Sequence, residues 1–180
     1  MLWLFLGGLA VWGTLVYNGL VRLRLRADNA WADINVQLKR RHDLIPNVVE
    51  AVKGYAAHER NVFVQVTEAR SRAMQAAGPR DKEAAEGALT GALRSLFAVA
   101  ENYPQLRANE SFMGLQQSLT QVEEALQGAR RYYNAVVRDY NTKCHVFPDQ
   151  LIARLGRFAP REFFQLEASQ EARAPRVTLP

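Results

Sequence analysis

The stretch that decides the fold is Met1–Val21, MLWLFLGGLAVWGTLVYNGLV, which contains no Asp, Glu, Lys, Arg or His. As an α-helix it would be ~31 Å long, and an uncharged apolar helix of that length can cross the hydrocarbon layer of a bilayer. Arg22, Arg24 and Arg26 follow at once. The sequence therefore predicts a membrane anchor, with the rest of the chain lying beside a membrane.

A cleaved signal peptide and a buried core helix are two other interpretations of this run. A cleaved signal peptide has a basic region before its apolar part and a small-residue cleavage site after it. Here no Lys or Arg precedes the apolar residues, and the run ends in Tyr17-Asn18-Gly19-Leu20-Val21. A buried core helix rarely runs this long without a charge. We therefore predict a retained single-pass anchor, and the arginines after it place the N-terminus outside and the following domain in the cytoplasm.

The overall composition narrows the classes of partner. The chain of 180 residues has a net charge of +5 and a pI of about 9.7. Its basic residues are scattered among acidic ones, which argues against a nucleic-acid-binding surface and suits anionic lipid or general solubility. The single cysteine, Cys144, excludes an intramolecular disulfide and a cysteine-only metal site.

Four segments beyond the anchor carry apolar residues spaced mostly by three and four, the pattern of helices packed in a bundle or coiled coil. The anchor helix is expected to leave the membrane as a rod ending near Arg41. Pro46 blocks a continuous helix and disfavours helical geometry at Ile45, which predicts a turn at His42–Leu44 and a second helix from Leu44. The apolar positions are 27, 31, 34 and 38, then 48, 52, 55, 62, 66, 69 and 73, then 85, 89, 92, 96 and 99, then 112, 115, 119, 122, 126, 129, 133, 136 and 140.

Proline and glycine mark the later helix ends, at Gly78-Pro79, Asn102-Tyr103-Pro104 and Phe147-Pro148. Short turns between four such segments favour an antiparallel four-helix bundle over the alternative, a long dimeric coiled coil. The predicted fold class is all-α, with an N-terminal transmembrane helix continuing into this bundle. The predicted domains are an anchor over 1–21, a bundle over 22–147, and a C-terminal strap with an extended tail over 148–180.

The last part of the chain is unusually apolar for a terminus. Left in water, its large side chains would form an exposed patch, which soluble domains rarely show without a partner. Two explanations stay open: a strap that folds back over the bundle, and a docking motif for another protein. Residues 173–180 are expected to be extended. The side chains concerned are Leu151, Ile152, Leu155, Phe158, Phe163 and Phe164.

No constellation of side chains predicts catalysis. His58-Glu59 begins like the HExxH zinc motif, but Val62 stands where the second histidine is required. His42, Asp43 and Glu50 could share a metal, as could Asp139 and His145, although helix surfaces and turns commonly carry such residues. Cys144 and His145 are neighbours and would point apart on a helix. We predict no catalytic, cofactor-binding or metal-binding residues.

Two other polar features of the sequence, a basic cluster and a glutamate within an apolar stripe, bear on the predicted bundle. Lys39-Arg40-Arg41-His42 is the one basic cluster, and its predicted place is a solvated helix end whose charges suit the helix dipole. Glu59 interrupts the second apolar stripe. If it is buried, Arg130 or Arg131 is a candidate partner; otherwise it lies at the rim of the bundle.

Several strings of the chain resemble the LemA family, and the likeness extends from Tyr17 to Val177. The densest string lies in residues 30–47. The strings are Tyr17-Asn18 with Leu20-Val21, Ala30-Trp31, Asp33-Ile34, Val36 through Asn47, Val52-Lys53-Gly54-Tyr55 with His58-Glu59, Tyr103-Pro104, Leu106-Arg107-Ala108-Asn109 with Phe112, Ala129-Arg130-Arg131, Tyr133-Asn134, Asp139-Tyr140-Asn141, and Phe158, Pro160 and Phe163-Phe164.

This resemblance implies a bacterial inner-membrane protein with a helical cytoplasmic bundle and no agreed enzymatic activity. Relatives that include a protein of magnetosome membrane formation raise membrane organisation as a role. We therefore expect a membrane-anchored helical scaffold that binds protein partners and is not an enzyme. The alternatives are a lipid-organising or membrane-remodelling protein and a metal-dependent enzyme. The oligomeric state and the partners stay open.

Overall fold

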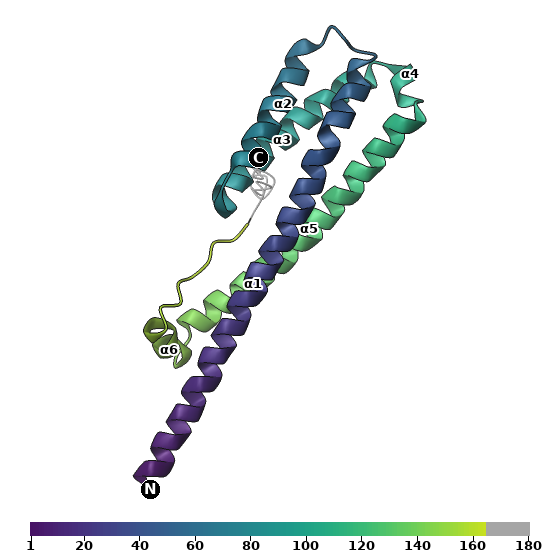
Figure 1. Ribbon diagram of the computed structural model, residues 1–180. Coiled ribbons are helices and arrows are strands. Elements are labelled where there is room, and N and C mark those ends of the chain that lie inside the picture. Colours follow the sequence, from purple (N-terminus) through teal and green to yellow (C-terminus); the bar gives the residue numbers. More distant parts are fainter. Residues whose placement is uncertain (165–180) are drawn as a thin grey trace, which may run out of the picture. The chain divides into compact units, whose positions relative to one another are not determined.

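A computed structural model gives the fold of the chain and describes residues 1–164 (Figure 1). Within this described part every regular element is a helix, which confirms the prediction of an all-α chain led by a long apolar helix. The extended tail predicted over residues 173–180 lies outside the described residues. The helices are α1 (Leu2–Lys53), α2 (Arg60–Gln75), α3 (Gly78–Glu101), α4 (Pro104–Arg107), α5 (Glu110–His145) and α6 (Asp149–Leu155).

The helix break predicted at His42–Leu44 is wrong. α1 continues through Pro46 and ends at Lys53, a helix of 52 residues. Proline has no N–H to donate to the carbonyl four residues earlier, which here belongs to His42. Arg70 of α2 supplies the missing donor, because its Nε lies 2.7 Å from the His42 carbonyl oxygen. A side chain from another helix therefore replaces the hydrogen bond that Pro46 removes.

Replacing Arg70 with methionine is expected to lower the free energy of unfolding by about 1–3 kcal/mol, the usual cost of a buried group left without its hydrogen bond. The expected loss shrinks in a Pro46→Ala background, because an alanine N–H can bond the His42 carbonyl directly. Arg72→Met is the matched control, since that arginine is well exposed on the same helix. Urea denaturation followed by circular dichroism measures all four variants. Equal losses of stability from Arg70→Met in both backgrounds would contradict the conclusion that Arg70 substitutes for the backbone hydrogen bond removed by Pro46.

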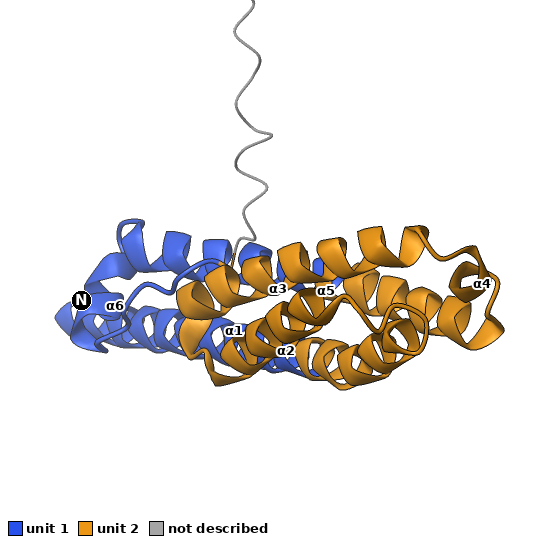
Figure 2. Ribbon diagram, turned by 90° about the horizontal axis from the view of Figure 1, so that it is seen from above, with its two compact units in different colours: residues 1–36, 127–163 blue, residues 37–126, 164–180 orange. Residues whose placement is uncertain are grey.

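The described chain divides into two compact units, coloured separately in Figure 2. Unit 1 consists of residues 1–36 and 127–163, and the described part of unit 2 consists of residues 37–126 and Phe164. Both α1 and α5 contribute to each unit. The domain boundaries predicted at residues 21 and 147 stay a prediction.

Unit 1 has its core around the middle of α1. The side chains of residues 2–11 are exposed, and burial of α1 begins at Val16 and Leu20. These two residues share a cluster with Tyr140 and Cys144 of α5, Ala153 of α6, and Phe158. Further along, the rings of Trp31 and Tyr133 lie 5.4 Å apart.

The segment after α6 is tied to α5 by hydrogen bonds to its backbone. Tyr133 Oη donates to the Glu162 carbonyl at 2.9 Å, and Tyr140 Oη donates to the Ala159 carbonyl at 3.0 Å. Asn141 bonds both backbone groups of Arg161, accepting from its N–H at 2.8 Å and donating to its carbonyl at 2.9 Å. These contacts describe a strap along α5.

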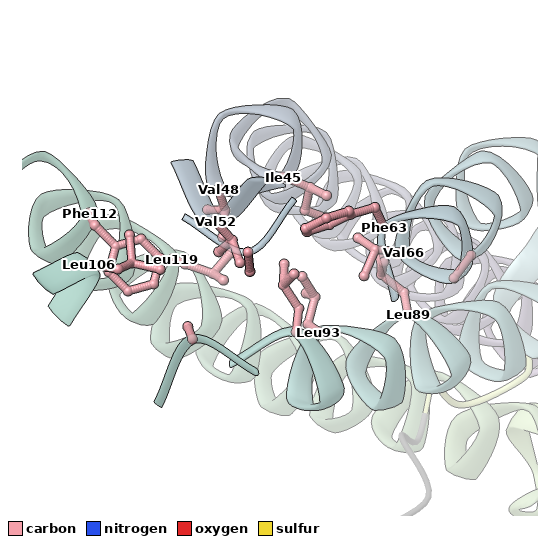
Figure 3. Close-up of a cluster of buried hydrophobic side chains, with 14 of the residues drawn as sticks. Ile45, Val48, Val52, Phe63, Val66, Leu89, Leu93, Leu106, Phe112 and Leu119 are labelled. Atoms are coloured by element: carbon pink, nitrogen blue, oxygen red, sulfur yellow. The ribbon is translucent and has the colours of Figure 1, made fainter. Parts of the chain in front are cut away.

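Unit 2 has a large cluster of buried apolar side chains (Figure 3). α1 contributes Ile45, Val48 and Val52, in the residues that the predicted turn had assigned to a separate helix. In α3 the buried stripe passes through Leu89 and Leu96 as predicted, but its other members are shifted by one residue. The buried members of this cluster are Ile45, Val48, Val52, Ala56, Phe63, Val66, Ala69, Ala73, Leu89, Leu93, Leu96, Ala100, Leu106, Phe112 and Leu119.

This core joins segments of α1, α2, α3 and α5 with the short α4. That the chain forms one antiparallel four-helix bundle stays a prediction. Glu59 lies outside the core: it is exposed and immediately precedes α2, so the apolar stripe does not pass through it.

Candidate functional site

A buried charged cluster lies within unit 2. Arg41 and His42 on α1 are 3% and 5% exposed, and Glu86 on α3 is fully buried. Arg41 Nη1 donates to Glu86 Oε2 at 2.7 Å, and His42 Nε2 lies 2.7 Å from Glu86 Oε1. Each oxygen of the carboxylate therefore has one nitrogen partner, and the pair of contacts joins α1 to α3.

The cluster extends through the other nitrogen of the Arg41 guanidinium. Its Nη2 donates to Thr90 Oγ1 at 2.8 Å and lies 3.4 Å from Glu123 Oε2 on α5. Thr90 in turn donates to the backbone carbonyl of Glu86 at 2.9 Å. With Arg70 of α2 bonded to the His42 carbonyl, four helices meet at this cluster.

Opposing effects set the ionisation of Glu86. Burial by itself would raise its pKa, but the hydrogen bond with His42 and the charges of His42 and Arg41 hold the pKa of Glu86 below its usual value. The folded state therefore favours the ionised carboxylate. Its contribution to stability is present at neutral pH and is lost as the pH falls through this lowered pKa.

The sequence prediction for the basic cluster was wrong at two positions. Lys39 and Arg40 are exposed as expected, but Arg41 and His42 are buried inside α1 and paired with Glu86. Glu86 had not been recognised as part of any site. One sequence feature could have revealed it, because Glu86 lies on the buried stripe of α3, three residues before Leu89.

The other candidate ligands do not form a metal site in the described part of the chain. His42 is occupied by Glu86, whereas Asp43 and Glu50 are exposed. Residues 1–164 contain no group of three or more His, Cys, Asp or Glu side chains arranged to hold a metal ion. Asp139 and His145 are both exposed on α5, and Cys144 is a buried free thiol.

A groove opens beside the charged cluster, within unit 2. Its volume is about 620 Å³, and α3 and α5 supply most of its lining. Leu93, Phe97 and Leu119 give it an apolar surface, while the Arg41–Glu123 pair lies at its wall. A second hollow of about 660 Å³ shares Phe97 with it and continues toward Arg107 and Phe112 at the α4 end of unit 2.

The lining of this groove combines apolar and charged side chains. Besides its apolar residues it carries Arg94, Glu101 and Glu123, which are charges of both signs, and the described lining contains no His or Cys. An apolar surface flanked by charges of both signs suits an amphipathic helix of another protein.

α1 is the one helix in the described residues that is long and apolar enough to cross a membrane.

Comparison with known proteins adds three relatives, each 23% identical to this chain. Magnetosome protein MamQ 2 of Paramagnetospirillum magneticum matches over 175 residues, 83% of this chain and 64% of the relative. Magnetosome protein MamQ of Magnetospirillum gryphiswaldense matches over 174 residues, 82% and 64%.

Protein LemA of Metamycoplasma hominis matches over 141 residues, which cover 76% of this chain and 63% of the relative. The chain thus spans less than two thirds of the length of these relatives. The family profile described as the LemA family matches residues 30–179, which include residues 37–126 of unit 2 and most of unit 1. This match confirms the resemblance seen in the sequence, and the chain belongs to the LemA family.

Proposed function

We propose that this protein is a membrane-anchored scaffold that binds a helical segment of a partner protein in the groove of unit 2 and is not itself an enzyme. The observation that carries the proposal is the groove of about 620 Å³, which combines an apolar surface with Arg94, Glu101 and Glu123. Apolar anchors along one helix face supply affinity in such grooves, and flanking charges select the orientation of the partner.

The buried cluster supports this function by fixing one wall of the groove. Arg41 is held by Glu86, Thr90 and Glu123, so its guanidinium has little freedom to move. A wall that is already ordered before binding reduces the entropy lost when a partner docks. The cluster is then a positioning device and takes no part in chemistry.

The anchor completes the proposal. The apolar N-terminal part of α1 spans the bacterial inner membrane, with the N-terminus outside and the helical part beyond Arg22 in the cytoplasm. This orientation follows from the arginines at positions 22, 24 and 26. The relatives named as magnetosome proteins favour membrane organisation as the second candidate function.

Photocrosslinking in membranes tests the scaffold. With p-benzoylphenylalanine in place of Ala98, which is exposed and lines the groove, irradiation is expected to capture a defined partner protein. The same probe in place of Val64, exposed on α2, is the matched control. Mass spectrometry identifies the adducts.

A charge reversal links the captured partner to the groove. Arg94→Glu changes an exposed charge in the lining and is expected to reduce capture at position 98 several-fold. Arg72→Glu, an equally exposed reversal on α2, is expected to leave capture unchanged. Identical proteins at positions 98 and 64, or capture that ignores Arg94→Glu, would contradict the proposal.

A further inference from the structure

Four large apolar side chains stay exposed between α5 and α6 and in α6 itself. Val146 is 52% exposed, Phe147 70%, Leu151 48% and Leu155 85%. We call these four residues the α6 apolar face. They lie within ten residues of one another in the chain, and Leu151 and Leu155, four apart on one helix, share a side of α6. The strap hydrogen bonds leave them uncovered, so packing inside unit 1 does not explain them.

The position of α6 along α1 identifies what surrounds these side chains. A Cβ placed at Gly13 would lie 3.7 Å from Ile152 Cδ1 of α6. The rings of Tyr17 and Phe158 are 5.4 Å apart. Both contacts belong to unit 1, and both involve residues of the uncharged run that ends at Val21. α6 is therefore packed against the membrane-spanning part of α1.

The depth of these contacts follows from helix geometry. Arg22 is the first charged residue after the apolar run and marks its border with the headgroups. At the α-helical rise, Tyr17 lies about 7 Å and Gly13 about 13 Å to the lipid side of Arg22. The headgroup region on each side of the hydrocarbon is only roughly 5–8 Å thick. The level of Gly13, where α6 packs, therefore lies within the acyl chains of that leaflet rather than among the headgroups.

We propose that the α6 apolar face is inserted into the bilayer leaflet next to Arg22, as a second membrane contact beside the anchor. The occupant of this face is lipid, because the face is continuous with the spanning helix. Charges nearby are compatible with this position: Lys143 and Asp149 pair with each other at 2.9 Å. Arg154 and Arg157 are exposed and have side chains long enough to reach headgroup phosphates.

Lipid photocrosslinking tests this insertion, which rests on the proposed anchoring by α1. The full-length protein is reconstituted in vesicles of phosphatidylethanolamine and phosphatidylglycerol. p-Benzoylphenylalanine replaces Phe147 or Leu155 in the α6 apolar face. It replaces Trp3, 84% exposed in the anchor, to report anchoring itself. The matched control is Tyr132, an exposed aromatic residue of α5 in the same unit.

Tyr132 is a control because its neighbour Tyr133 contacts Trp31, which lies beyond Arg22 on the water side. Intact mass is expected to show several-fold more lipid adduct at positions 147 and 155 than at 132. Adducts at position 3 with only control levels at 147 and 155 would overturn the insertion and leave anchoring intact. Absence of adducts at position 3 would overturn both. Protein–protein adducts in place of lipid at 147 and 155 would assign the face to another chain and overturn the insertion.

Discussion

Replacing Glu86 with alanine is expected to destabilise unit 2 by about 3–5 kcal/mol, the typical cost of removing one partner from a buried ion pair. Arg41 and His42 would stay buried beside an empty position, with no carboxylate to accept their hydrogen bonds. Since a domain of this kind has a stability of about 5–15 kcal/mol, such a loss removes a large share of it. Urea denaturation of the detergent-solubilised chain, followed by circular dichroism, measures the change.

Two control variants distinguish the cost of leaving Arg41 and His42 without a carboxylate from the cost of removing the volume of the Glu86 side chain. Glu123→Ala removes the half-exposed partner of Arg41 and is expected to cost less than about 1 kcal/mol. The triple variant Arg41→Met, His42→Leu, Glu86→Leu replaces the whole cluster with apolar side chains and is expected to recover most of the loss, as such replacements often do. Losses of equal size for Glu86→Ala and Glu123→Ala would mean that the cluster is solvated.

The Glu86→Ala variant is also expected to affect the groove. Arg41 lines the groove and is held in place partly by Glu86. Without that carboxylate the guanidinium has only Thr90 and Glu123 to orient it. If the proposed partner binds in this groove, its capture at position 98 is expected to be weaker even in molecules that stay folded, because the wall of the groove is no longer ordered before binding.

The all-α fold class could be predicted from the sequence because long stripes of apolar residues at helical spacing are compatible with few other structures. The stripe over residues 112–140 alternates three and four for eight turns, and its members Phe112, Leu119, Leu126, Tyr133 and Tyr140 are all buried. A strand has a period of two and cannot bury such a set on one face. Errors of one residue, as in α3, remain because apolar residues also flank the buried stripe: Ala85, Ala92 and Val99 are partly buried against the same core.

The continuation of α1 through Pro46 could not be predicted from local rules. The rule that proline ends a helix assumes that the lost hydrogen bond is not replaced. Here Arg70, which follows His42 by 28 residues, provides the replacement. Whether such a donor arrives depends on how α2 packs on α1, and the local sequence around Pro46 does not contain that information.

The charged cluster was missed for a related reason. Arg41 and His42 stand in a basic string that is typical of an exposed helix end, and only Glu86 on α3 makes their burial possible. Finding the pair requires the register of α1 against α3. The tail shows the same limit: its composition predicted apolar contacts, but which side chains are buried, such as Phe158, and which stay exposed, such as Leu155, depends on the level at which α6 meets α1.

Leu96→Asp is expected to prevent unit 2 from folding at neutral pH. Leu96 is fully buried on α3, in the large apolar cluster of that unit. A carboxylate there either stays charged without a partner or takes up a proton, and both cost several kcal/mol, which is comparable to the whole stability of a small domain. Far-UV circular dichroism is expected to show a large loss of helix.

Ser95→Asp is the matched control, because it introduces the same charge one residue earlier on the same helix, at an exposed position. Its expected effect is within about 0.5 kcal/mol, as for most surface substitutions. The comparison also bears on function, since Leu93 and Phe97 of the same helix line the groove. If Leu96→Asp keeps the helix content and melting temperature of Ser95→Asp, α3 does not face a closed core, and the groove would belong to a more open surface than the one described here.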